Sequence, residues 1–386
     1  MSVVVVGASL AGFSLVRDLR ERGYGDSITV VGDEVHPPYD RPPLSKEYLH
    51  ADVDIALGDT NDPGTHWSLG RRATGITSTA AGPGVTLDDG AVIAGQSLVL
   101  ATGARARTLP GAQALAGIHT LRTVDDAYAI RAALHTARTV VIVGAGLIGS
   151  EIASTAATLG VRVTIVELAT DPLSGVFGPH LGALCADLHA ANGVRLRTGV
   201  AVAEFLGDAR VSAVRLTDGT LLAADAVIIG IGAVPNTEWA QDSPLRIDNG
   251  FVTDSQCRTT IPDIYAIGDC ARAYQRTSGT HHRSEHWSNA TAQARIAAAA
   301  IVGAPAANIP TTYFWSRQYG RMIQFAGDRR PDDAVRFIDG DPSTPSCTAL
   351  YERDGEPVAV FAIDNARLFT RYRKQIERRP AAFATP

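Results

Sequence analysis

The 386-residue sequence is poor in cysteine, with only four in the whole chain. No two of them form the C-x-x-C or C-x-x-x-x-C spacing of a zinc site or a dithiol redox centre. They are Cys185, Cys257, Cys270 and Cys347. Their wide scatter also argues against a disulfide scaffold. We therefore expect four reduced, mostly structural thiols and no metal site.

Long hydrophobic runs and a strong excess of one charge are absent as well. No stretch approaches the roughly 18 uninterrupted apolar residues of a membrane helix, and a net charge of −5 gives no basic field for nucleic acid. A strand pattern that begins at Ser2 leaves no room for a secretion signal. We expect a soluble, cytoplasmic protein of two or three domains that binds neither membranes nor nucleic acid.

The sequence does contain one glycine loop twice. VVVVGASLAG spans residues 3–12 and VVIVGAGLIG spans residues 140–149. Each follows a β-branched run and precedes a helical pattern, which is the context of a dinucleotide-binding motif. The first glycine makes the turn, the second lets the backbone approach a pyrophosphate, and the third permits close packing of helix on strand. The copies differ most clearly at Ser9, which stands where the later loop has Gly146.

An acidic residue follows each loop at the end of the next strand pattern. SITVVGDE spans residues 27–34 and VRVTIVEL spans residues 161–168. A carboxylate about 20 residues past the loop can accept hydrogen bonds from a ribose diol. In the second copy this acid is Glu167; in the first, Asp33 is favoured over Glu34. No arginine follows Glu167 to compensate a 2′-phosphate, so the second site should prefer NAD over NADP.

Each half then closes with a strand that runs into a glycine turn. QSLVLATGARARTLPG (96–111) contains Thr102 and Gly103, and DAVIIGIGAVPN (225–236) contains Gly232. Later, DIYAIGDCA places Asp269 where its carboxylate could reach a polyol. Two dinucleotide sites in one chain suggest an enzyme that holds one dinucleotide and turns over another, most economically FAD and NADH.

Further motifs make the pattern specific. They are VGDEVHPPYDRPPLSKEYL (31–49), LRTVDDA (121–127), EHWSNA (285–290) and YFWSRQYG (313–320). Together with the loops they give nearly the whole chain a close resemblance to the FAD-dependent NADH:ferredoxin reductases that serve oxygenases. Glutathione reductase, rubredoxin reductase and apoptosis-inducing factor share that fold. Disulfide reductases of the fold carry redox cysteines beside the flavin, whereas no cysteine precedes Cys185 here, so electrons must leave the flavin without a thiol.

The resemblance implies an α/β fold with two Rossmann-like three-layer dinucleotide-binding domains and a C-terminal α+β interface domain. The FAD domain would comprise residues 1–108 and 227–304, the NAD domain 109–226 and the interface domain 305–386. The implied reaction is hydride transfer from NADH to FAD, followed by single-electron transfer to an iron–sulfur ferredoxin that supplies a monooxygenase or ring-hydroxylating dioxygenase. A rubredoxin reductase and an NADH-responsive redox sensor remain alternatives. We expect a monomer or weak homodimer.

The resemblance also assigns the residues closest to the chemistry. Lys46 would lie near flavin N5, where a cation stabilises negative charge on the reduced ring. Trp287 would lie against the isoalloxazine, with Trp315 stacked nearby, and Glu151 would lie beside the nicotinamide. Outside the resemblance, Lys46 could be a solvated helix residue, and large aromatic residues such as these tryptophans are more often part of a core.

The remaining expected cofactor-binding residues follow the motifs. Arg41 would assist Lys46, and Arg122 matches an arginine that contacts FAD in the family, although alone it could form a surface salt bridge. The others are Gly7, Ser9, Ala11, Gly12, Asp33, Glu34, Ala73, Ala101, Thr102, Gly103, Gly144, Gly146, Leu147, Ile148, Gly149, Glu167, Gly232, Gly268, Asp269, Glu285 and His286.

Two features bear on the electron carrier. Arg317 stands where relatives usually have Asp, which could alter partner preference. The C-terminal segment holds six basic residues against Glu377: Arg367, Arg371, Arg373, Lys374, Arg378 and Arg379. Such a patch could steer an acidic ferredoxin, but a solvated helix without a partner is at least as good an interpretation.

Overall fold

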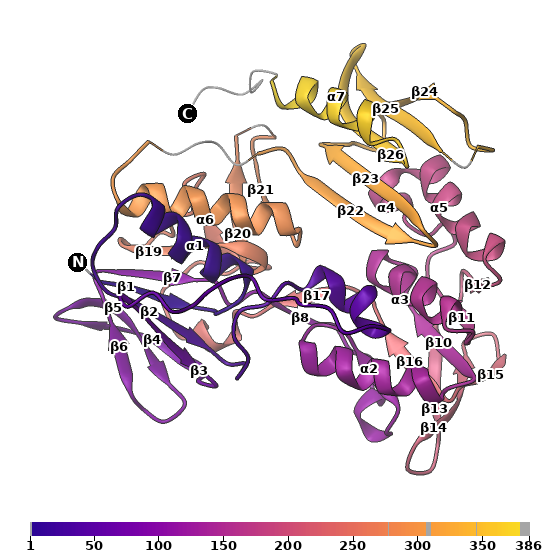
Figure 1. The fold of residues 1–386 in the computed structure, drawn as a ribbon, viewed down its shortest axis with the longest axis horizontal. Helices are drawn as coiled ribbons and strands as arrows, with labels where there is room; N and C mark the ends of the chain where they lie inside the picture. Colours follow the sequence, from indigo (N-terminus) through magenta and orange to yellow (C-terminus); the bar gives the residue numbers. More distant parts are fainter. Residues whose placement is uncertain (1, 277, 306–309, 345, 379–386) are drawn as a thin grey trace.

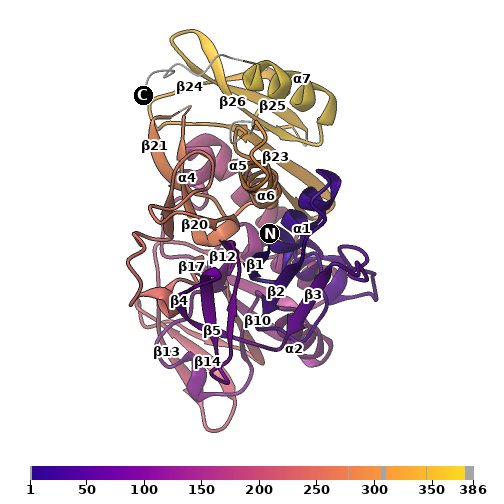
Figure 2. The same ribbon diagram turned by 90° about the vertical axis from the view of Figure 1, so that its left-hand side faces the viewer.

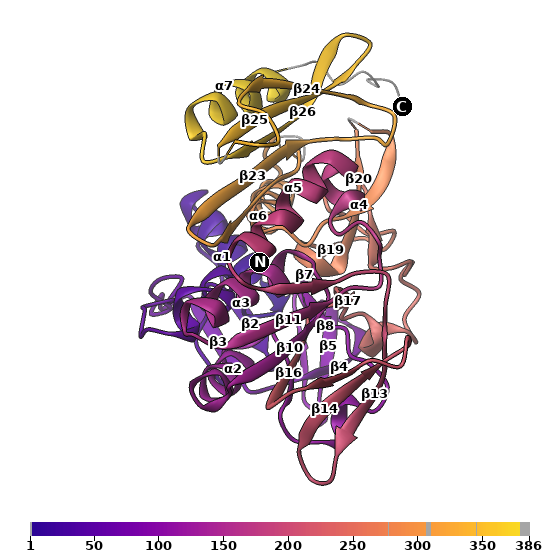
Figure 3. The same ribbon diagram turned by 90° about the vertical axis from the view of Figure 1, so that its right-hand side faces the viewer.

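The computed structural model describes residues 2–276, 278–305, 310–344 and 346–378. Two five-stranded parallel sheets and one five-stranded antiparallel sheet form its three main parts (Figure 1). The antiparallel sheet lies at one end of the molecule and the β13–β14 hairpin (Val202–Gly207, Val211–Leu216) at the other (Figures 2 and 3). The fold is therefore α/β, as expected. Within the described ranges, no helix is both long and apolar enough to cross a membrane.

The first parallel sheet contains the N-terminal glycine loop. Its strands, in spatial order, are β19 (Ile264–Ala266), β7 (Ser97–Leu100), β1 (Val3–Val6), β2 (Ile28–Gly32) and β3 (Thr65–Leu69). Along β1, Val3 and Val5 pack toward helices α1 (Leu10–Glu21) and α6 (Trp287–Ile301). Val4 and Val6 pack on the other face, against the small sheet β4–β5–β6 (Ala73–Thr79, Gly82–Leu87, Val92–Ala94). This two-sided burial explains why β1 is an unbroken valine run.

The second parallel sheet contains the other glycine loop. Its strands, in spatial order, are β12 (Arg195–Arg197), β11 (Arg162–Val166), β10 (Thr139–Val143), β16 (Ala226–Ile229) and β9 (Ile118–Thr120). Helices α2 (Val124–Thr136) and α3 (Leu147–Thr158) cover one face, and β13, β14 and β15 (Leu221–Ala223) cover the other. The internal repeat of the sequence is thus a structural repeat. We call the part built on the first parallel sheet the first unit and the part built on the second parallel sheet the second unit.

One expected domain boundary is corrected by the strand pairing. Residue 227, expected to begin the second FAD segment, lies inside β16, which pairs with β10 and β9 of the second sheet. The chain leaves that sheet only after Ile229. A short two-stranded ribbon, β8 (Ala104–Ala106) with β17 (Ala233–Pro235), then joins the outgoing and returning segments. The strand was evident from its apolar run, but the run alone does not say which sheet the strand joins.

The C-terminal part is an antiparallel sheet covered by one helix. Its spatial order is β22 (Tyr313–Gln318), β23 (Arg321–Gly327), β26 (Glu356–Ile363), β25 (Cys347–Arg353) and β24 (Ala334–Asp339). Helix α7 (Ala366–Glu377) packs on one face through Phe369 and Ile376. The other face packs against α4 (Ser174–Phe177) and α5 (Pro179–Ala191) of the second unit.

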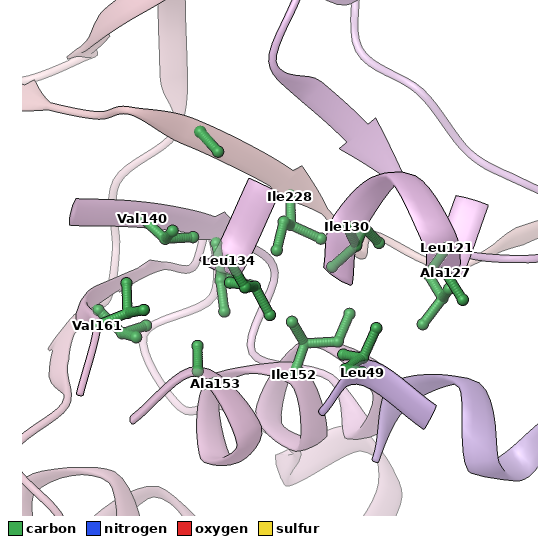
Figure 4. Packing of buried hydrophobic residues seen from close by; sticks show 14 of the residues in the cluster. Leu49, Leu121, Ala127, Ile130, Leu134, Val140, Ile152, Ala153, Val161 and Ile228 are labelled. Atoms are coloured by element: carbon green, nitrogen blue, oxygen red, sulfur yellow. The ribbon is translucent and has the colours of Figure 1, made fainter. Parts of the chain in front are cut away.

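The remaining short elements complete the connections. They are the strands β18 (Phe251–Thr253), β20 (Ala271–Gln275) and β21 (Thr280–Arg283), and the 3₁₀ turns η1 (Pro42–Ser45), η2 (Glu47–Leu49), η3 (Ala112–Ala114), η4 (Glu238–Ala240) and η5 (Gly268–Cys270). Turns η1 and η2 connect the first unit to the second. Leu49 of η2 is fully buried and packs with Ile130 and Ile152 of the second unit (Figure 4). The segment after β2 is thereby fixed against helix α3.

Truncation of Leu49 tests this connection. We expect Leu49→Ala to lower the free energy of unfolding by about 2–5 kcal/mol, because it leaves a cavity between the two units. Leu221→Ala is the matched control, since Leu221 is 56% exposed on β15, and should change that free energy by less than about 0.5 kcal/mol. Denaturant titration of both variants is the measurement. Equal effects would show that the Leu49 contact does not join the units.

Candidate functional site

A cavity opens along the junction of the three parts. Its volume is about 750 Å³. Most of the expected site residues line it: Gly7, Ser9, Ala11, Asp33, Glu34, Arg41, Lys46, Ala73, Ala101, Thr102, Gly103, Arg122, Leu147, Ile148, Glu151, Gly268, Asp269, Glu285, His286, Trp287 and Trp315. Gly12, Gly144, Gly146, Gly149, Glu167 and Gly232 lie outside the lining. Residues from distant motifs therefore share one space.

The first and third glycines of each loop are required by close backbone packing. A Cβ added at Gly12 would lie 2.0 Å from the carbonyl oxygen of Gly7, and one at Gly149 would lie 2.2 Å from that of Gly144. Gly7 and Gly144 also have positive φ, at 124° and 102°. No other residue type fits these positions without backbone movement. The two loops thus have the same construction.

The middle position of the second loop is open. A Cβ at Gly146 would meet only the carbonyl oxygen of Gly230, at 3.9 Å. Ser9, at the same position of the first loop, has an extended backbone, and its hydroxyl accepts a hydrogen bond from Nε of Arg41 at 3.2 Å. The space left at this position is where a pyrophosphate approaches such a loop.

The acids after the two loops accept hydrogen bonds from backbone and side-chain groups. Glu167 accepts from the amide of Ala145 at 2.7 Å and from that of Ala169 at 2.8 Å. Glu34 pairs with Arg41 at 2.6 Å and accepts from the Tyr39 hydroxyl. Asp33, the favoured acid, is exposed at the cavity wall.

Arg41 belongs to the phosphate-loop end of the cavity. Besides Ser9 and Glu34, it contacts the carbonyl oxygen of Arg122. These contacts hold the Arg41 guanidinium beside Ser9 and Glu34, and its expected assistance to Lys46, at the other end of η1, stays a prediction.

Arg122 and Asp269 come from distant segments and form an ion pair of 2.7 Å inside the cavity. The Nε atom of Arg122 is buried and has no hydrogen-bond partner in the described part of the chain. A buried guanidinium donor normally has a partner. The free donor and the first glycine loop fit an anionic dinucleotide in this cavity.

Lys46 and Glu151 form a nearly buried ion pair between the first unit and helix α3. The Nζ–Oε2 distance is 2.7 Å, and the side chains are 13% and 6% exposed. The Ser45 hydroxyl donates to the same carboxylate oxygen at 2.5 Å, and the Ser316 hydroxyl of β22 donates to the other at 2.6 Å. Gln318 in turn donates to Ser316 at 3.0 Å. Three donors satisfy the buried charge, as a buried ion pair requires.

The two tryptophans meet at the rim of the cavity. The rings of Trp287 and Trp315 are 6.2 Å apart in an edge-to-face arrangement, and Trp287 is 38% exposed. The indole N–H of Trp287 donates to Asp40 at 2.8 Å. Trp315 also stacks on Tyr313, with the ring centroids 5.8 Å apart. An aromatic edge therefore joins the cavity to the outer surface.

Glu285 and His286 precede helix α6. The His286 ring stacks on Phe314 at 4.3 Å, and burial lowers its pKa to about 4, so the ring is neutral at physiological pH. Glu285 pairs with Arg283 at 2.7 Å. Together they place the first turn of α6 against the cavity.

None of the four cysteines, which all lie in the described ranges, lines the cavity. Their thiols are free and buried. Burial raises the pKa of Cys185 to about 12 and that of Cys347 to about 11, so these thiols are not thiolates at neutral pH. This agrees with electron transfer without a thiol relay.

Sequence reasoning missed Ser45, Ser316 and Asp40. Ser316 carried a usable signal, because it is a small polar residue on the inward face of a strand whose outward neighbours are Trp315 and Arg317. The sequence around Ser45 and Asp40 contains no such signal, because their partners Glu151 and Trp287 are more than 100 residues away.

The basic C-terminal run is partly neutralised. Arg373 pairs with Glu377 at 2.8 Å and lies over the Tyr313 ring. Arg317 pairs with Glu47 at 2.9 Å. Arg379 lies outside the described residues.

Comparisons with known proteins agree with this geometry. Residues 1–294 match the family model described as pyridine nucleotide-disulphide oxidoreductase, and residues 313–385 match the reductase C-terminal model. The chain is 36% identical to the ferredoxin reductase component of chlorobenzene dioxygenase from Cupriavidus sp. (strain PS12), covering 98% of this chain and 93% of that protein. It is 34% identical to putidaredoxin reductase from Pseudomonas putida, covering 94% and 88%.

A solved structure gives the same result. The reductase of the covalent putidaredoxin reductase–putidaredoxin complex matches with a TM-score of 0.93 at 34% identity, covering 98% of this chain and 94% of that chain. The family implies a flavin and a nicotinamide nucleotide as cofactors. The chain belongs to the pyridine nucleotide-disulphide oxidoreductase family and resembles the ferredoxin reductases of oxygenase systems within it.

Proposed function

We propose that this protein is a cytoplasmic NADH:ferredoxin reductase that holds FAD and supplies electrons to a monooxygenase or a ring-hydroxylating dioxygenase. The observation that carries the proposal is one cavity that is bordered by the first glycine loop and by Leu147 and Ile148 of the second, has no cysteine in its lining, and opens at an aromatic edge. Relatives named as ferredoxin reductase components of dioxygenase systems support it.

The first glycine loop would hold the FAD pyrophosphate, with Arg41 and Ser9 beside it. Arg122 would offer its free Nε donor to the same dinucleotide. Lys46 would supply positive charge beside the ring system, with Glu151 fixing its position. A bound flavin supplies the chemistry, by accepting a hydride and releasing electrons singly.

The second glycine loop would hold the NADH pyrophosphate, and Glu167 the adenosine ribose. The Glu167 carboxylate already accepts two amide hydrogen bonds, which orient it. Each of its oxygens has a further lone pair for a ribose hydroxyl. A 2′-phosphate would meet the negative charge without a neighbouring arginine, since Leu168, Ala169 and Thr170 follow.

The carrier would dock over the edge formed by Trp287 and Trp315. Arg317 lies beside this edge, but Glu47 partly neutralises it. Exposed basic residues of α7, including Arg367 and Arg371, remain to attract an acidic partner.

The purified protein provides the direct test. We expect a yellow protein that about one equivalent of NADH bleaches, and rapid turnover with one member of a ferredoxin panel. Turnover with rubredoxin alone would favour a rubredoxin reductase. A bleached protein that persists with bound NAD and passes electrons to no carrier would favour a redox sensor and contradict the proposal.

Glu167→Ala should raise KM for NADH by about 10-fold or more, since charge-assisted hydrogen bonds contribute about 1.5–3 kcal/mol. It should also narrow the preference for NADH over NADPH, because the repulsive charge is gone. Glu167→Gln is the control. It keeps an acceptor for the Ala145 amide and should change mainly the kcat/KM for NADPH. The ratio of kcat/KM for the two nucleotides is the measurement. An unchanged ratio in Glu167→Ala would refute the assignment.

Two variants separate the structural contribution of the Lys46–Glu151 pair from a contribution of Lys46 to the reaction. Lys46→Met leaves a buried carboxylate without its cation and should cost about 3–5 kcal/mol of stability. Lys46→Met combined with Glu151→Leu should recover most of that stability. If Lys46 serves the reaction, the rate of NADH-driven bleaching stays at least about tenfold low in both variants. A double variant that regains the wild-type rate would limit Lys46 to a structural role.

A further inference from the structure

The turn between β22 and β23 contains an unusual residue. Tyr319 and Gly320 both have left-handed backbone angles, with φ of 52° and 74°. A two-residue hairpin turn of this kind favours asparagine, aspartate or glycine at its first position. A tyrosine there is strained and persists only where its surroundings hold it.

The contacts of Tyr319 explain its presence. Its hydroxyl lies 2.7 Å from Nδ1 of His189 on α5, and the two rings meet edge to face at 5.6 Å. Its backbone N–H donates to the Ser154 hydroxyl of α3 at 2.6 Å. The tip of the C-terminal hairpin is therefore anchored to two helices of the second unit.

The contacts continue from His189 to the second glycine loop. Nε2 of His189 lies 3.3 Å from the Ser150 hydroxyl, which is 3.5 Å from the carbonyl oxygen of Ala145. His189 and Ser150 are 1% and 0% exposed. Burial lowers the pKa of His189 to about 4, so its ring is neutral near pH 7, with one nitrogen donating and the other accepting.

One arrangement of protons satisfies every group. Tyr319 donates to Nδ1, Nε2–H donates to Ser150, and Ser150 donates to the Ala145 carbonyl. The opposite tautomer would turn the Ser150 proton toward His189 and leave the carbonyl without this donor. Because the Ala145 amide donates to Glu167, the peptide groups on both sides of Ala145 are held, one by the ribose acid and one by this chain.

The first glycine loop lacks this support. In the structural repeat, Ala8 corresponds to Ala145 and Phe13 to Ser150. Phe13 is buried and packs on Trp67, and it has no hydroxyl to donate. The hydrogen-bonded chain thus belongs only to the loop that would bind the exchanging nucleotide.

We propose that Tyr319, His189 and Ser150 are positioning residues for the nicotinamide dinucleotide, through which the tip of the C-terminal hairpin holds the second glycine loop in its binding geometry. The inference rests on the proposed function only in taking NADH as the ligand of that loop. It adds a requirement that the loop motif does not contain, namely a hydrogen-bonded contact from another part of the molecule.

Tyr319→Phe, assayed in the flavin-loaded protein, tests the proposal. Loss of one buried hydrogen bond should raise the Kd for NAD⁺, titrated directly, and KM for NADH by about 3- to 10-fold, with kcat toward ferricyanide and flavin content unchanged. Tyr351→Phe is the matched control, because Tyr351 is a buried tyrosine of the same sheet whose hydroxyl donates to the Phe177 carbonyl at 2.5 Å. It should change both constants by less than about twofold, even if it lowers Tm.

Ser150→Ala provides a second variant at the other end of the chain. It should raise the same two constants, and Tyr319→Phe/Ser150→Ala should be no worse than the stronger single variant, because both break one path. If Tyr319→Phe does not fold, Ser150→Ala alone is sufficient to test the proposal. Unchanged constants in the folded variants, or equal increases in Tyr351→Phe, would overturn the inference. A wild-type protein that does not oxidise NADH would refute the proposed function instead.

Discussion

The buried carboxylate of Glu151 is the point on which the arrangement of the three parts depends. A charge this far from water is tolerated only when donors surround it. Lys46 and Ser45 come from the first unit, and Ser316 comes from the C-terminal sheet. None of these donors is supplied by the helix that carries Glu151, so the charge is satisfied only when the three parts are assembled. The interaction therefore adds specificity to an interface that apolar contacts alone would define less sharply.

One face of helix α3 is lined by further buried polar residues. Ser150, Glu151, Ser154 and Thr155 are all buried, and their spacing puts them on one side of the helix. Ser154 holds the hairpin backbone, and Thr155 donates to the carbonyl of Ser45. A helix face packed against a neighbour is ordinarily apolar. Here it is polar because it contacts backbone and charged groups from both neighbours, and those contacts begin directly after the glycine loop.

Much of this molecule could be predicted from sequence, for reasons that are local. The glycine loops were found because close backbone approaches at Gly12 and Gly149 leave no alternative residue, and the parallel sheets because strands buried on both faces are continuous valine and isoleucine runs. The boundary at residue 227 was misplaced, because it depends on which segments meet in space. Ser45, Asp40 and His189 are invisible in sequence for the same reason, since each gains its role from a partner more than 30 residues away.

Strand β22 shows how one local pattern can serve two sites. Its residues alternate, so Trp315 and Arg317 lie on one face of the strand and Ser316 and Gln318 on the other, where Ser316 donates to Glu151 and Gln318 donates to Ser316. The same strand leads into the turn whose Tyr319 reaches His189. A displacement of β22 would therefore change the aromatic edge and the hydrogen bonds to α3 together, because a pleated strand cannot move one face without the other. The surface proposed for the carrier and the loop proposed for the nucleotide are thus held by a single rigid element.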